Sequence, residues 1–254
     1  MFPDNYMSHF VLVGADVNQI KRSDWTPLML VCTKLGSAAL ETLRVLLNCK
    51  ADPHITNKDG WTALHIACRT GHCDTVKLLL ENFRALANVR SNNGRYPLHI
   101  AALHGHCTVV SLLHKYNSSV VSARDWCGVT PLIDSCRGNH DSVAALLLKC
   151  GAHVTESDNM GLTCLHVAAQ AGSCNMIRML IEDLNVDINL AAAKSKFTSL
   201  HCAANAGQLE AVRLLLLQGA DPTLEDAHGR RAQDVVCSGP KRGDILSLLR
   251  EFEL

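Results

Sequence analysis

Thr62-Ala63-Leu64-His65 is one copy of a short motif that recurs along this chain of 254 residues. The other clear copies begin at Thr26, Tyr96, Thr130, Thr163 and Thr198, and Arg231-Ala232-Gln233-Asp234 is a degenerate last copy. Their first residues lie 36, 34, 34, 33, 35 and 33 positions apart. Self-similarity at this period is typical of a solenoid, in which each repeat is one small supersecondary unit. The motif therefore predicts a repeat protein whose function lies on its surface.

The copy around Thr62 predicts how one repeat folds. The segment Asn57-Lys58-Asp59-Gly60 predicts a tight turn, because Gly60 can adopt positive φ at a hairpin tip. Thr62 is a good N-cap for an inner helix that we expect over Ala63–Thr70. Glycine or asparagine should end each inner helix in the left-handed conformation, at Gly71, Gly105, Asn139, Gly172 and Gly207. An outer helix should follow, with Val76, Leu79 and Leu80 on its buried side.

A turn followed by two helices at this period resembles an ankyrin repeat, and Gly219-Ala220-Asp221-Pro222 resembles the segment that closes one. The resemblance implies an all-α solenoid of helix-turn-helix units with short β-hairpin-like loops. We expect a single array over 1–254. Its parts would be a partial repeat over 1–22, repeats over 23–57, 58–91, 92–125, 126–158, 159–193 and 194–226, and a C-terminal capping repeat over 227–254.

The two ends of the array predict different structures. Residues 9–18 resemble the tail of a repeat whose first helix is absent, so either the chain is a truncated or alternatively started product or residues 1–18 form a makeshift cap. A last amphipathic helix is expected over 241–254. Ile245, Leu248, Leu249 and Phe252 should face inward, whereas Lys241, Arg242, Arg250, Glu251 and Glu253 should face water.

Composition indicates a folded, soluble chain, with 48% apolar residues and a mean hydropathy of +0.08. Lys plus Arg and Asp plus Glu both number 24, so no global charge favours nucleic acid or an anionic membrane. The start lacks the pattern of a signal peptide, and no apolar run is long enough to span a bilayer. We expect a monomer in the cytoplasm, with the nucleus as an open second location.

The 12 cysteines follow the repeat register, and none belongs to a C-x-x-C motif. Cys32, Cys68 and Cys136 share an inner-helix position that other copies fill with alanine, which predicts a small buried slot. Equivalent atoms of stacked helices stand about 8–10 Å apart. A disulfide needs Cα atoms within about 7 Å. Reduced, structural cysteines are therefore expected.

Histidine recurs too regularly to form a catalytic set, and we expect His65, His99, His166 and His201 to bridge to the backbone of neighbouring loops. His72-Cys73 and His106-Cys107 contain zinc-ligand types, but sister positions lie too far apart to share an ion. The chain contains no phosphate-binding loop, no nucleophile elbow and no paired carboxylates outside the repeat register. The sequence therefore predicts a protein that is not an enzyme and holds no cofactor or metal.

The variable face of the array, formed by hairpin tips and the exposed ends of inner helices, is basic and aromatic in its N-terminal half. The residues are Arg22, Trp25, Lys34, Lys58, Trp61, Arg69, Arg90, Arg95, Arg124, Trp126 and Arg137. Tryptophan and arginine dominate interface hot spots, so we expect an acidic protein surface to dock along residues 20–140. Packing of Trp25 and Trp61 between adjacent hairpins is the alternative. RNA is a weaker rival, because the net charge is zero and the chain contains three tryptophans.

Four stretches, over residues 20–29, 56–61, 127–130 and 184–187, resemble one branch of the ankyrin family, the co-regulators of alanyl-tRNA synthetase. This resemblance implies binding to the catalytic domain of that enzyme, and acceptance of misactivated serine on lysine side chains in support of translational fidelity. Lys21 and Lys58 would be the acyl acceptors, although Lys58 can also be read as an ordinary solvated lysine. The alternative function is a generic ankyrin scaffold or adaptor, or a ubiquitin-ligase substrate receptor.

Overall fold

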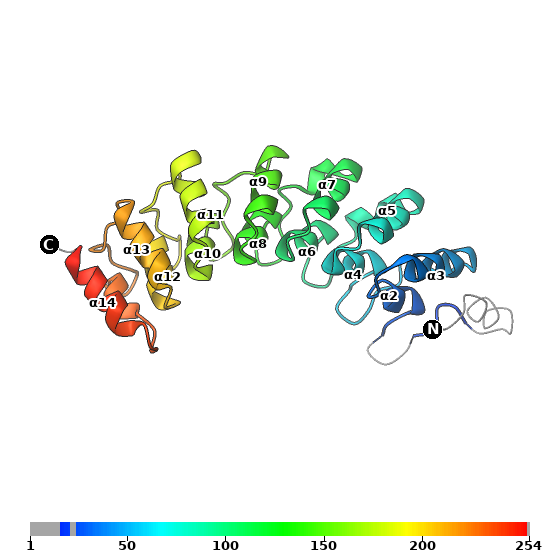
Figure 1. Ribbon diagram of the computed structural model, residues 1–254, viewed down its shortest axis with the longest axis horizontal. Helices are drawn as coiled ribbons and strands as arrows, with labels where there is room; N and C mark the ends of the chain where they lie inside the picture. The colour runs from blue at the N-terminus through cyan, green and yellow to red at the C-terminus, as the bar shows by residue number, and fades with distance from the viewer. Residues whose placement is uncertain (1–15, 21–23, 253–254) are drawn as a thin grey trace. The chain divides into compact units, whose positions relative to one another are not determined.

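The computed structural model describes residues 16–20 and 24–252 (Figure 1). Within these residues the regular structure is helical, and an isolated β-bridge pairs Ser157 with Thr163. The predicted all-α class is therefore confirmed. The chain divides into two compact units that meet in sequence between Trp126 and Cys127, and each unit is described by itself.

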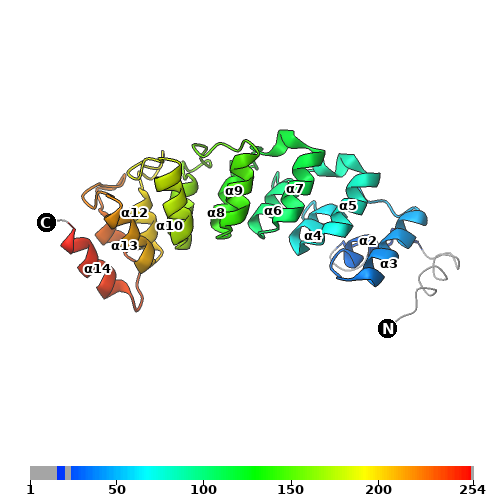
Figure 2. The same cartoon turned by 45° about the horizontal axis from the view of Figure 1, so that its top comes forward.

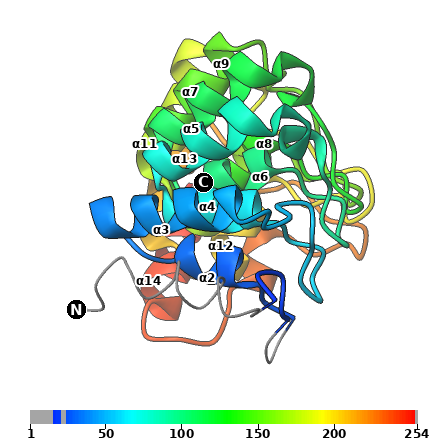
Figure 3. The same cartoon turned by 90° about the vertical axis from the view of Figure 1, so that its right-hand side faces the viewer.

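The described part of the first unit contains three pairs of inner and outer helices. The pairs are α2 (Pro27–Val31) with α3 (Ser37–Asn48), α4 (Ala63–Thr70) with α5 (Cys73–Asn82), and α6 (Pro97–Leu103) with α7 (Cys107–Tyr116). Short 3-10 helices, η1 (Arg84–Asn88) and η2 (Ser118–Val120), follow α5 and α7. The inner helix α4 packs against α6 and the outer helix α5 against α7 (Figures 1 and 2). Figure 3 shows the loops of this unit on the side of α4 and α6 that faces away from α5 and α7.

The second unit repeats the same plan. Its pairs are α8 (Pro131–Arg137) with α9 (Asp141–Lys149), α10 (Cys164–Ala171) with α11 (Cys174–Arg178), and α12 (Ser199–Asn205) with α13 (Leu209–Leu217). Helix α11 continues into a π-helical turn, η3 (Met179–Asp183), and the unit ends with the 3-10 helix η4 (Ala232–Val235) and α14 (Arg242–Glu251). The inner helices stack in the order α8, α10, α12 and η4 (Figure 1).

The predicted bridges to neighbouring loops are confirmed for His65, His166 and His201, and each begins within an inner helix. Nδ1 of His65 accepts the Thr62 backbone N–H at 3.2 Å, so Nε2 carries the ring proton and donates to the carbonyl oxygen of Arg95 at 3.2 Å. His166 and His201 make the same bridges, to the carbonyl oxygens of Phe197 and Arg230, each at 3.0 Å. Each bridge satisfies a donor at the helix start and fixes the next hairpin to the preceding inner helix.

Copies without histidine cap their helices by other means. In α2 and α8 the threonine hydroxyl alone accepts the N–H three residues later, from Met29 and from Ile133, both at 3.3 Å. In η4 the carboxylate of Asp234 takes the histidine's place, because its Oδ2 accepts the Arg231 N–H at 2.9 Å. The degenerate last copy of the motif is therefore a short capped turn.

The predicted helix limits and core positions are confirmed. Helix α4 spans Ala63–Thr70, and Val76, Leu79 and Leu80 are fully buried. The residues expected in the left-handed conformation have positive φ: Gly71 (76°), Gly105 (79°), Asn139 (58°), Gly172 (74°) and Gly207 (69°). Cys32, Cys68 and Cys136 are also fully buried, in the slot that alanine fills elsewhere.

The prediction for Phe252 is wrong. Ile245, Leu248 and Leu249 are buried as expected, whereas Phe252 is 40% exposed. Helix α14 ends at Glu251, so Phe252 is its C-cap and lies at the end of the helix, past the last buried turn. Glu253 and residues 1–15, on which other expectations about the two ends depend, lie outside the described part of the chain.

Candidate protein-interaction surface

Three of the hairpins are shaped by a buried polar side chain that accepts hydrogen bonds from the backbone of its own turn. Oδ1 of Asn57 accepts the N–H groups of Asp59 at 3.0 Å and of Trp61 at 2.8 Å. Asp158 and Asp226 do the same in the second unit. Because these acceptors bond to the backbone, side chains at the tips remain variable.

Neighbouring hairpins are joined at their tips by one backbone bond at equivalent positions, which we call the tip ladder. In the first unit the N–H of Asn92 donates to Asp59 O at 3.0 Å, and the N–H of Trp126 donates to Asn93 O at 3.1 Å. In the second unit the pairs are Asn159 with Cys127 and Ala227 with Ser195. Tip residues of adjacent repeats therefore lie side by side, so their side chains form one surface.

Lys58, Trp61 and Arg69 belong to one repeat of this surface. Lys58 is exposed at the tip, and its carbonyl oxygen accepts from Nδ2 of Asn92 at 2.8 Å. Trp61 is half-buried with its ring stacked on His65 at a centroid distance of 6.1 Å, and the Arg69 guanidinium lies 5.9 Å from the Trp61 ring. The indole thus packs on its own repeat and keeps part of its surface in water.

Arg90, Tyr96 and Trp126 form a second group, which we call the Arg90 cluster. The Arg90 guanidinium carbon lies 4.7 Å from the centroid of the Tyr96 ring and 5.0 Å from that of Trp126. Its Nε donates to the Tyr96 hydroxyl at 2.8 Å. Trp126 is 60% exposed, yet its Nε1 donates to Asn92 O at 3.0 Å. An exposed guanidinium is therefore held by two aromatic rings.

The other arginines of this region differ in how they are held. Arg95 is half-buried and its Nε donates to the buried carboxylate of Asp125 at 3.3 Å, so its charge is matched within the unit. Arg124 is exposed, one residue before Asp125. The structure thus distinguishes a paired arginine from exposed ones, which the sequence pattern does not.

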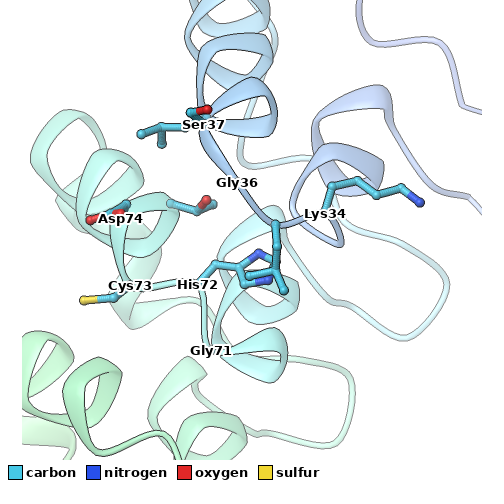
Figure 4. A pocket seen from close by; sticks show the side chains of 10 residues that line it. Lys34, Gly36, Ser37, Gly71, His72, Cys73 and Asp74 are labelled. Carbon is cyan, nitrogen blue, oxygen red and sulfur yellow. The ribbon is translucent and has the colours of Figure 1, made fainter. Parts of the chain in front are cut away.

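The remaining predicted site residues lie apart from this group or outside the description. Lys21 and Arg22 are not among the described residues, and Trp25 is half-buried. Lys34 is exposed at a pocket of about 350 Å³ lined by parts of 34–40 and 71–75. Figure 4 shows its side chain directed away from the His72 ring. Arg137 is exposed at the end of α8 and belongs to the second unit.

Tyr96 is the functional candidate that the sequence pattern missed. It occupies the motif position that is threonine in most copies, and its N–H donates to His99 Nδ1 at 3.2 Å, so it still serves as the helix N-cap. Its ring stacks on His99 at 6.0 Å while its hydroxyl accepts from Arg90. The signal that could have found it is this departure from threonine.

The described residues offer no metal site of three or more His, Cys, Asp or Glu side chains. No disulfide joins any of the 12 cysteines in this structure. Burial lowers the pKa of His65 to about 4, although its bond to Arg95 acts in the opposite direction, so His65 is neutral at physiological pH. Among the helices of the described residues, none is both long and apolar enough to cross a bilayer. What the surface offers chemically is cations and aromatic rings for non-covalent binding.

Comparison with known proteins agrees with this geometry. The family model for ankyrin repeats in three copies matches residues 5–90, 28–125, 84–158, 112–192 and 155–226. The chain therefore belongs to the ankyrin-repeat family, and ankyrin repeats are protein-interaction modules that are generally non-enzymatic. This assignment covers the fold and a general protein-binding role.

The curated relatives match only a short part of the chain. Notch-regulated ankyrin repeat-containing protein B of Danio rerio is 46% identical over 41 residues, which are 16% of this chain and 37% of that protein. The Homo sapiens Notch-regulated ankyrin repeat-containing protein is 41% identical over 49 residues, which are 19% of this chain and 43% of that protein. The chain thus spans less than half the length of these relatives.

Proposed function

We propose that this protein is a non-enzymatic co-regulator of alanyl-tRNA synthetase that accepts misactivated serine on lysine side chains, and so supports translational fidelity. The stretches over 20–29, 56–61, 127–130 and 184–187 resemble ankyrin repeat domain-containing protein 16. The general protein-binding role of the family supports this proposal. We further propose that it acts as a monomer in the cytoplasm, with the nucleus as an open second location.

The structural observation that best supports this proposal is the position of Lys58. Its side chain is exposed at a hairpin tip, in the repeat that carries Trp61 and Arg69 and beside the tip residue Asn92. Within the described residues no carboxylate lies within ion-pair distance of its ammonium group. A partner that docks on the tips would therefore meet this amine directly.

Serine transfer needs no active site in this protein. The deprotonated Lys58 amine attacks the carbonyl carbon of seryl adenylate, the bond from that carbon to the phosphate oxygen breaks, and AMP leaves as the amine proton passes to solvent. The product is a seryl amide on Nζ. Docking on the synthetase would supply the effective concentration of amine, because it holds both reactants together. Each lysine reacts once, so the protein is consumed stoichiometrically.

Mass spectrometry tests the proposal. The protein would be incubated with alanyl-tRNA synthetase, ATP and serine, and its lysine peptides would be searched for a seryl amide. We expect adducts on Lys58 and Lys21 that Lys58→Arg and Lys21→Arg remove, whereas Lys77→Arg serves as the control because Lys77 lies on α5 beside Glu81. Absence of adducts would favour the alternative function, a generic scaffold, adaptor or ubiquitin-ligase substrate receptor.

A further inference from the structure

From the Arg90 cluster we infer that this protein binds an acidic peptide segment of a partner protein, with a carboxylate on Arg90 and an apolar or aromatic side chain over Trp126. This inference rests on the general protein-binding function and is independent of which partner carries the segment.

Arg90 is arranged to receive a carboxylate. Its Nε is engaged by the Tyr96 hydroxyl, and the two rings restrict the guanidinium, so less side-chain entropy is lost on binding. Within the described residues no carboxylate lies within ion-pair distance of Arg90, in contrast to Arg95 with its bond to Asp125. The terminal amino groups of such a guanidinium can donate two hydrogen bonds to one carboxylate.

Trp126 provides the apolar part of the site. An indole that is 60% exposed is a large aromatic surface in water, and two hydrogen bonds already hold this residue to the preceding hairpin, from its backbone N–H to Asn93 and from Nε1 to Asn92. The added Cβ of an alanine at Gly94 would lie 2.6 Å from the ring, so the indole packs directly on the turn. A ligand side chain that covers this indole removes apolar surface from water. The loss of conformational entropy is small, because the indole is already held in place.

The local charge favours an acidic partner. Residues 57–61, 90–96 and 124–126 contain four basic side chains, Lys58, Arg90, Arg95 and Arg124, and two acidic ones, Asp59 and Asp125. Because Asp125 is bound to Arg95, the exposed charge is mainly positive although the whole chain is neutral. Single-stranded nucleic acid needs cations that follow its backbone and successive stacking rings. The Arg90 cluster has one exposed indole and few cations, which favours a peptide.

Fluorescence anisotropy tests this inference with a labelled peptide of glutamates that flank one central phenylalanine. We expect Arg90→Gln to weaken binding by roughly tenfold or more. Arg178→Gln, a change of an exposed arginine on α11, should leave binding unaltered. A peptide with glutamine in place of glutamate, and one with glycine in place of phenylalanine, should bind more weakly. Equal binding by the glutamine peptide, or by Arg90→Gln, would overturn the inference.

Two further measurements keep the test decisive. Peptide titration of the unmodified protein should change its tryptophan emission, and Trp126→Phe should abolish that change; emission that stays constant at saturating peptide contradicts the site. A labelled single-stranded oligonucleotide that binds more tightly than the acidic peptide would also contradict it. The synthetase and serine assay does not depend on this peptide, so failure of either proposal can be recognised separately.

Discussion

The ring of His65 is bonded to the backbone of Arg95, 30 residues farther along the chain, with 3.2 Å between Nε2 and the carbonyl oxygen. The side chain of the same Arg95 binds Asp125, a further 30 residues away. Arg95 thus connects three successive repeats, through its carbonyl on one side and its guanidinium on the other. A substitution of His65 should therefore destabilise the neighbouring repeats as well as its own.

We predict that acid lowers the stability of the protein between about pH 6.5 and pH 4. Burial lowers the pKa of His65 from its ordinary 6.5 to about 4, and it also lowers the pKa of His166 and His201. In this range the unfolded chain binds more protons than the folded one, so the free energy of unfolding decreases as pH falls, by on the order of 3 kcal/mol for His65. Urea unfolding at several pH values measures this loss of stability. His65→Leu should be less stable at pH 7, and its free energy of unfolding should change less with pH. An unchanged pH dependence of stability in His65→Leu would contradict the assigned role of His65.

The hairpin glycines should differ in their tolerance of alanine. Gly60 and Gly229 occupy equivalent positions with φ of 75° and 72°, so both substitutions force a left-handed alanine at about 1 kcal/mol. At Gly60 the new Cβ would also lie 2.5 Å from the backbone nitrogen of Asn92, whereas at Gly229 its nearest neighbour is Glu225 Oε2 at 3.9 Å. We expect Gly60→Ala to lower the free energy of unfolding by about 1–3 kcal/mol more than Gly229→Ala. Equal losses in urea titrations would show that the tips are not closely packed.

Asp226 should tolerate asparagine much better than alanine. Its Oδ1 accepts the N–H groups of His228 and Arg230, and its Oδ2 lies 2.8 Å from the Arg230 guanidinium. Burial opposes ionisation of this carboxyl, but the bonds from Arg230 and His228 outweigh it and lower the pKa of Asp226 to about 2. Asp226→Ala should cost about 1–3 kcal/mol by denaturant unfolding. Asp226→Asn keeps the turn bonds that Asn57 makes in its own hairpin, and a loss as large as that of alanine would refute their importance.

The thiols should fall into reactive and unreactive groups. Burial raises the pKa of Cys32 and of Cys202 to about 12, and it raises that of Cys68. A hydrogen bond with Cys164, followed by burial, raises the pKa of Cys136. Since the thiolate is the nucleophile, iodoacetamide at pH 8 should label exposed Cys127 well before these four. Peptide mass spectrometry gives the labelling rate of each cysteine. If the four buried cysteines of the native protein were labelled as fast as Cys127, the inner helices would have to open readily. Unfolding in urea should make the labelling rates of the buried and exposed cysteines similar.

Local rules explain which parts of the fold could be predicted from the sequence. The limits of α4 and the bridge made by His65 follow from a cap, a terminating glycine and a motif that repeats, all readable within one copy. Phe252 was placed wrongly because its burial depended on where α14 ends, and fraying ends are poorly specified by periodicity. The meeting of Arg90 with Trp126 was also hidden. It depends on contacts between neighbouring repeats, and on the unexpected tyrosine at position 96.

The tip ladder has a consequence for how this surface can change. Its bonds are made by backbone groups alone, so Lys58, Asn92 and Trp126, which occupy equivalent positions, can differ completely in size and charge while the hairpin spacing stays the same. The ladder maintains the hairpin spacing whichever side chain a tip carries, and side chains such as those of Asn92 and Trp126 add their own bonds to the preceding hairpin. Single substitutions at the hairpin tips can therefore change which partner this surface binds, while the backbone bonds between hairpins are kept.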